Sequence, residues 1–130
     1  MKLRRMNMLL AIAAGLLATG HLALTPLFYR DWTIGSLWFV GTGLAMLIGA
    51  GANLIAAGAA GAGGAGGGGE RMRRLALVAI NLAMTAFFAS AWPVLPEPQV
   101  VLGGILFAGL AVCAALSGTV AAEQEKPDAR

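Results

Sequence analysis

Charged residues are scarce in this chain of 130 residues. Only 12% of its residues are Asp, Glu, Lys or Arg, against roughly 25% in soluble domains, whereas 58% are hydrophobic. Mean hydropathy is +0.78. An ordinary soluble domain is therefore excluded, and the composition indicates a single integral membrane domain.

Residues that carry out chemistry are equally few. Cys113 is the only cysteine, which excludes an intrachain disulfide and makes a disulfide-forming oxidoreductase untenable. No aspartate or glutamate lies in a long apolar run, although proton-coupled exchange through a small bundle normally uses such a group. We therefore predict no enzyme, no cofactor and no metal site.

Nucleotide-binding and hydrolase motifs are also missing. Gly61, Gly63 and Gly66 fit G-x-G-x-x-G, but only because the segment consists of alanine and glycine and no strand precedes it. There is no G-K-[ST] and no G-x-S-x-G. A Ser/His hydrolase built from His21 with Ser36 or Ser90 would lack an acid to orient the imidazole.

Four apolar runs are present, and each is long enough to cross a hydrocarbon core of about 30 Å as a helix. They cover about residues 6–24, 35–58, 75–92 and 100–120. Thr25-Pro26 is expected to end the first helix, because proline lacks a backbone donor. The predicted fold is an all-α membrane protein, an antiparallel up-down bundle of four transmembrane helices.

The start of the chain also has the basic and apolar regions of a signal peptide, with Ala18-Thr19-Gly20 as a possible cleavage site. The apolar run continues past that site, which favours an uncleaved helix. Residues 59–69, almost entirely alanine and glycine, predict a flexible linker, and residues 121–130 predict a polar, disordered tail.

Basic residues give the orientation. The chain has nine basic residues, and Arg30 is the only one of them on its side of the predicted spans. The others all fall on the opposite side. By the positive-inside rule, both termini and the linker 59–69 are expected in the cytoplasm. An arginine-rich, lysine-poor composition suggests a bacterium, and hence its inner membrane. The basic clusters predict contact with lipid headgroups rather than with nucleic acid; they comprise Arg4, Arg5, Arg71, Arg73 and Arg74.

Small residues recur at helical spacing and predict close helix packing. In the run 35–58, Gly41, Ala45 and Gly49 fall on every fourth residue and lead to Asn53, so we expect the other helices to surround this one. A second small face is predicted at Gly104, Ala108 and Ala111. Further small faces are expected in the first span at Ala11, Ala14 and Ala18, and in the third at Ala76, Ala79, Ala83, Ala86 and Ser90.

Four polar residues within the spans are candidates for function: His21, Asn53, Asn81 and Thr85. Asn53 and Asn81 have similar predicted depths, so we expect a hydrogen bond between them. His21 is expected to bond to a backbone carbonyl or to Ser36. A haem or metal ligand is the alternative, with a symmetric dimer supplying a second copy of His21.

Three functions follow from these features. The favoured one is a structural or accessory subunit that packs through its small-residue faces, either in a homo-oligomer or in a larger membrane complex. The alternative is a homo-oligomeric transporter or pore lined by His21, Asn53, Asn81 and Thr85. The third is a membrane protein that binds haem or quinone at His21.

Overall fold

The computed structural model describes the backbone of residues 2–59 and 68–124, with side chains through residue 117. It contains four helices, α1 (Lys2–Phe28), α2 (Ile34–Ala59), α3 (Gly68–Ala91) and α4 (Pro98–Gln124). Within the described ranges there is no strand. Each helix is long and apolar enough to cross a membrane. The prediction of an all-helical chain with four apolar helices is thus confirmed.

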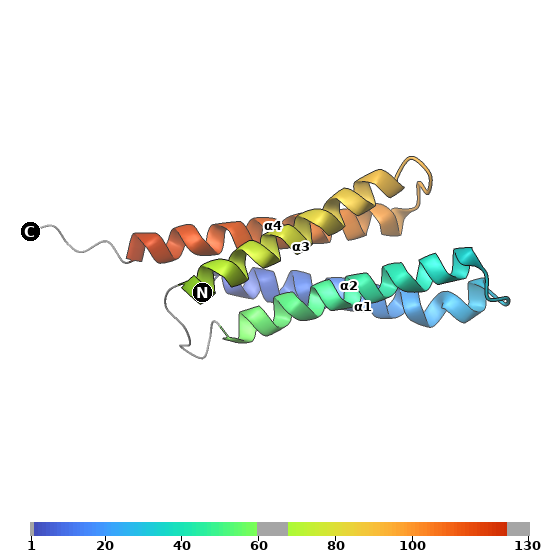
Figure 1. Ribbon diagram of the computed structural model, residues 1–130, viewed down its shortest axis with the longest axis horizontal. Coiled ribbons are helices and arrows are strands. Elements are labelled where there is room, and N and C mark those ends of the chain that lie inside the picture. The colour runs from blue at the N-terminus through green and yellow to red at the C-terminus, as the bar shows by residue number, and fades with distance from the viewer. Residues whose placement is uncertain (1, 60–67, 125–130) are drawn as a thin grey trace, which may run out of the picture.

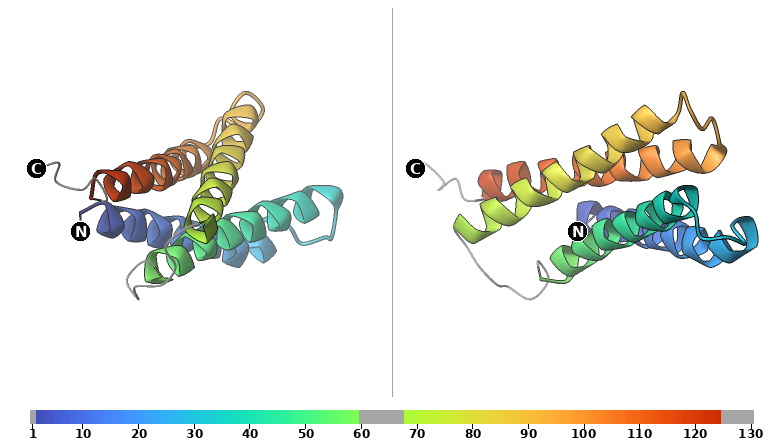
Figure 2. Two further views of the ribbon diagram at one scale, coloured as in Figure 1. Left: turned by 60° about the vertical axis from the view of Figure 1, so that its left-hand side comes forward. Right: turned by 45° about the vertical axis from the view of Figure 1, so that its right-hand side comes forward.

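The helices associate in two pairs (Figure 1). α1 lies along α2 and α3 lies along α4, and these are the two most extensive helix contacts. α1 also packs against α4, whereas α2 meets α3 over a shorter stretch. Figures 1 and 2 show the pairs separating toward the end where the connections 29–33 and 92–97 lie.

The expectation that all other helices surround residues 35–58 is wrong. α2 has extensive contact only with α1, and the larger contact between the two pairs is that of α1 with α4. Ala11, Ala14 and Ala18 of α1 are fully buried and belong to the same core as Phe107 and Leu110 of α4. Small residues of this kind allow helices to approach closely. Leu10 of α1 lies against Gly109 of α4.

The helices are longer than most of the predicted spans, and three of the differing ends have a clear physical reason. α1 continues through Pro26 to Phe28, because a proline in the last turn removes only one backbone bond, and the Tyr29 N–H still donates to the Thr25 carbonyl at 2.9 Å. α3 begins at Gly68, with Glu70 in a first turn that favours negative charge. α4 begins at Pro98, a favourable first helical residue.

The predicted linker and tail fall mostly outside the described residues. Ala59 ends α2, and residues 68 and 69 belong to α3, so only the part 60–67 of the linker is left without description. Residues 121–124 continue α4 rather than forming a tail, and residues 125–130 lie outside the described range.

Candidate functional site

Asn53 of α2 and Asn81 of α3 form a reciprocal amide pair. Asn53 Nδ2 donates to Asn81 Oδ1 at 2.9 Å, and Asn81 Nδ2 donates to Asn53 Oδ1 at 3.1 Å. Both residues have 0% exposure. Asn53 Nδ2 also donates to the Gly49 carbonyl, and Thr85 Oγ1 donates to the Asn81 carbonyl. The predicted hydrogen bond is confirmed.

This pairing limits what the two amides can do. Each side-chain oxygen already accepts one bond from the other helix, so the pair joins α2 to α3 where their contact is short. Amides that bond each other inside one chain are less available to line a water-filled path. A pore formed by several copies stays a prediction.

The predicted packing residues lie in different environments. In α2, Gly49 is buried against the Phe107 ring, whereas Gly41 and Ala45 are exposed. In α4, Ala111 is buried, and Gly104 and Ala108 line an open groove beside α3. The small face of α3 is exposed throughout, at Ala76, Ala79, Ala83, Ala86 and Ser90.

Two glycines at tight helix contacts were missed by the sequence patterns. A Cβ at Gly103 would lie 2.5 Å from Cζ of the buried Phe88, and one at Gly43 would lie 2.7 Å from Cδ2 of Leu22. Only glycine allows these side chains to rest on the backbone. Gly103 is next to the predicted packing residue Gly104, and Gly43 is two residues from the predicted Gly41. The glycine-rich stretches were therefore recognised from the sequence, but these two tight contacts lie on other faces of the same helices.

His21 of α1 is held by α2. Its Nε2 lies 3.1 Å from the Phe39 carbonyl oxygen, and since a carbonyl only accepts, this nitrogen carries the proton. The imidazole also stacks on the Phe39 ring, with centroids 3.6 Å apart and planes inclined by 17°. Of the two predicted partners, the carbonyl is therefore the correct one.

Ser36, the other predicted partner, caps α2 instead. Its Oγ accepts from the Thr33 N–H at 2.7 Å, while its own N–H donates to Thr33 Oγ1 at 3.3 Å. This reciprocal arrangement is a capping box with serine in the third position. Ser36 consequently makes no bond to His21, and Ser90 donates to the Phe87 carbonyl, so no Ser–His pair forms.

A cavity of about 240 Å³ lies between the two helix pairs, at the end where they separate. Five aromatic side chains contribute to its wall together with His21. These are Tyr29, Trp38, Phe39, Phe87 and Phe88. Thr42 and Gln99 add polar groups to the wall. Because His21 Nε2 donates to Phe39, the imidazole can offer a ligand only its accepting Nδ1. A largely aromatic wall with a few polar groups suits an apolar ligand.

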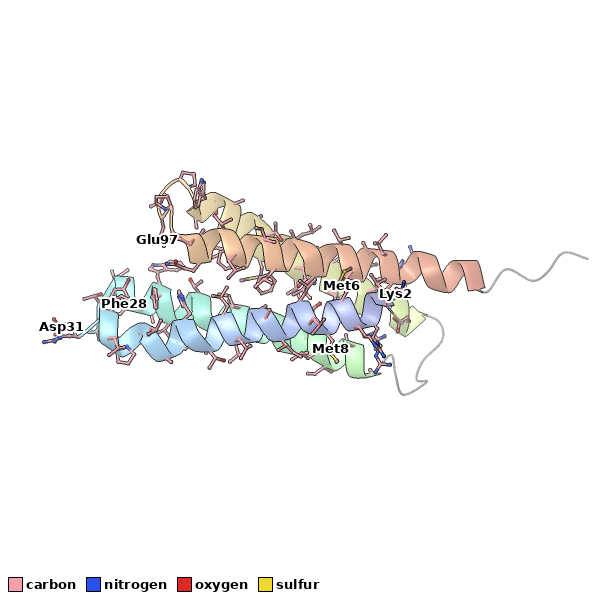
Figure 3. All side chains as sticks on the ribbon, turned by 180° about the vertical axis from the view of Figure 1, so that it is seen from behind. Lys2, Met6, Met8, Phe28, Asp31 and Glu97 are labelled. Carbon is pink, nitrogen blue, oxygen red and sulfur yellow. The ribbon has the colours of Figure 1, made fainter. Side chains whose placement is uncertain are left out.

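The charged side chains gather at the two ends of the helices. Figure 3 shows Asp31 and Glu97 at the end with the short connections, and Lys2 at the opposite end. At the Lys2 end, Arg4, Arg73 and Arg74 line a second pocket, whereas Arg5 and Arg71 lie outside it. Arg4 is exposed like Arg5 and Arg71, and Arg73 and Arg74 are half-buried.

Metal ligands are not grouped in the described residues, where no three His, Cys, Asp or Glu side chains come together. The candidates for function are therefore the amide pair, the aromatic cavity and the arginine pocket. No protein-family model, curated protein or solved structure matches this chain significantly.

Proposed function

We propose that the protein is a small accessory subunit of a bacterial inner membrane, an up-down antiparallel bundle with both termini in the cytoplasm. Four apolar helices and their short connections support insertion as a bundle. The start of α1 and the end of α4 lie toward the same end of the helices in Figure 1, and that end carries Arg4, Arg73 and Arg74. The positive-inside rule makes it cytoplasmic.

One observation favours helix docking as the function: the alanine face of α3 is uncovered. Small residues that face lipid contribute little packing energy, whereas small residues between helices allow the two backbones to approach closely. Leu75 and Leu82, elsewhere on this helix, provide the bulk expected against lipid. We propose that a transmembrane helix of a partner, or of a second copy, packs on the face formed by Ala76, Ala79, Ala83 and Ala86.

The first experiment identifies the partner. Native mass spectrometry of the protein gently extracted from its own membrane is expected to show one defined heteromeric or homomeric mass. Ala83→Leu would place a bulky side chain on the docking face and is expected to reduce that species at least tenfold. Ala23→Leu makes the same change at an exposed site on α1 and should leave it intact. A monomer in every sample would refute the proposal.

The cavity beside His21 supports a second function, the binding of an apolar ring such as a quinone. Haem ligation through Nε2 would break the bond to Phe39 and the ring stacking, whereas the hydroxyl of a reduced quinone could donate to the remaining Nδ1 of His21 and leave both in place. Organic extracts of the purified protein should then contain quinone, with less in His21→Phe. Quinone-free extracts would exclude this function, and a haem absorption band would reverse the preference.

A further inference from the structure

The pocket at the Lys2 end differs from the aromatic cavity in size and chemistry. It encloses about 100 Å³ and is lined by residues from all four helices. Arg4, Asn7, Arg73 and Arg74 contribute polar groups from α1 and α3. Its remaining wall is largely apolar, with Ala56, Ala57, Leu77 and Ala114. The pocket therefore combines a cationic part with an apolar part.

Positive charge in this pocket is only partly neutralised. Glu70 forms an ion pair with Arg73. Within the described side chains, Arg4 and Arg74 form no ion pair. Three arginines and one glutamate line the pocket, so an anion would be attracted there.

Asn7 adds a second requirement for a ligand of this pocket, a hydrogen-bond donor. Its Oδ1 is buried and accepts no hydrogen bond from the described residues, while its Nδ2 donates to the Asn53 carbonyl at 3.4 Å. A buried acceptor without a donor is unfavourable. A ligand that carries a hydroxyl group next to its anionic group would satisfy both the arginines and Asn7.

We propose that this pocket binds the headgroup of an anionic glycerophospholipid. The phosphodiester lies between Arg4 and Arg74, and a hydroxyl of a glycerol headgroup donates to Asn7 Oδ1. The acyl chains leave past Leu77 and Ala57 along the helices. This inference requires the membrane insertion proposed above, but it does not depend on a partner docking on α3.

Position and charge favour this ligand over its rivals. Arg4 lies two residues before the apolar part of α1, which begins at Met6, and Arg74 directly precedes that of α3. Both therefore lie near the level at which a bilayer has its phosphates. A free phosphate would leave the apolar wall unused. A zwitterionic headgroup would bring its own cation next to three arginines.

The test is native mass spectrometry of purified protein titrated with phospholipids of matched acyl chains. Phosphatidylglycerol is expected to bind more tightly than phosphatidylcholine. Arg4→Gln and Arg74→Gln should each weaken that binding about fivefold, since each removes a direct hydrogen bond from a charged side chain to the phosphate. Arg71→Gln, an exposed residue outside the pocket, is the control and should change it less than twofold.

The hydroxyl contact is tested with phosphatidylmethanol, which has the same charge but no headgroup hydroxyl. The wild-type protein should bind it severalfold more weakly than phosphatidylglycerol, and Asn7→Leu should remove this difference. Arg4 is exposed, so its variant is expected to fold even if an Arg74 variant does not.

Three results would overturn the proposal. Equal losses with Arg71→Gln and Arg74→Gln would mean adsorption to a charged surface. Equal affinity for phosphatidylcholine and phosphatidylglycerol would remove the role of charge. Binding of inorganic phosphate that depends on Arg4, without selective binding of lipid, would identify a free phosphate site instead.

Discussion

The sequence predicts similar membrane depths for Asn53 and Asn81, and the structure pairs their side chains. At these two residues the prediction and the structure agree most closely. Replacing one partner leaves the other amide buried without its bond, which costs more than the bond itself contributes. We expect Asn81→Leu to lower the free energy of unfolding by about 1 to 3 kcal/mol. The measurement is reversible unfolding in mixed micelles followed by circular dichroism. The double variant Asn53→Leu/Asn81→Leu should recover part of the loss, and a simple sum of two losses would contradict the pairing.

Gly103 and Gly104 provide a matched pair of neighbouring glycines. A Cβ at Gly103 would overlap the Phe88 ring at 2.5 Å, whereas one at Gly104 would meet only Phe88 Cβ at 3.4 Å. We expect Gly103→Ala to destabilise the protein by about 1 to 3 kcal/mol, because the buried ring must move. Gly104→Ala should change stability by less than about 1 kcal/mol. Equal stability of the two variants, measured by the same unfolding assay, would contradict this packing.

At the scale of the helix, the start of α2 depends on Thr33 and Ser36. Their reciprocal bonds satisfy backbone donors that the first turn of a helix leaves unpaired. Ser36→Ala is expected to cost about 0.5 to 2 kcal/mol and to increase amide hydrogen exchange in this turn. Thr42→Ala, which removes only an exposed bond to the Trp38 carbonyl, is the control and should have a small effect. Unchanged exchange in the first turn of α2 would show that the cap is dispensable.

The helices also show which predictions hold at this scale. The spans were predictable because an apolar helix satisfies its backbone groups within itself, so its existence depends on its own residues alone. In α1 the buried face was predictable as well, since Ala11, Ala14 and Ala18 form its one uninterrupted small face and have 0% exposure. α2 has small residues on several faces, and there Gly41 and Ala45 proved to be exposed.

For the whole molecule, Cys113 reports whether the two helix pairs stay together. Its side chain is fully buried, and the same helix contributes Phe107 and Leu110 to the core between the pairs. A membrane-permeable maleimide should therefore modify it slowly in the intact protein. Phe107→Ala would leave a cavity in the core and is expected to raise the rate about tenfold or more. Val112→Ala, on an exposed position next to Cys113, should leave the rate unchanged. Rapid modification of the unaltered protein would contradict the burial of Cys113.

The candidate sites show the limit of sequence reasoning for the whole molecule. The individual residues His21, Arg4 and Arg74 could be selected, because polar groups are rare in and beside apolar helices. Their surroundings could not be selected, because the aromatic cavity and the arginine pocket each combine side chains from both helix pairs. Asn7, whose buried Oδ1 lacks a donor, became a candidate only through those contacts.

The sequence by itself determined the number of helices, their approximate extents and the asymmetric charge at their ends, because each of these is a local property of an apolar segment and its flanks. Only the tertiary structure decided which face of each helix is buried. A shift of one residue turns a helical face by about 100°, so Gly41 and Gly43 belong to different faces although both occur in the same glycine-rich run. Complementary shape selects between such faces: Leu22 rests on Gly43 and Phe88 on Gly103, and those side chains come from other helices.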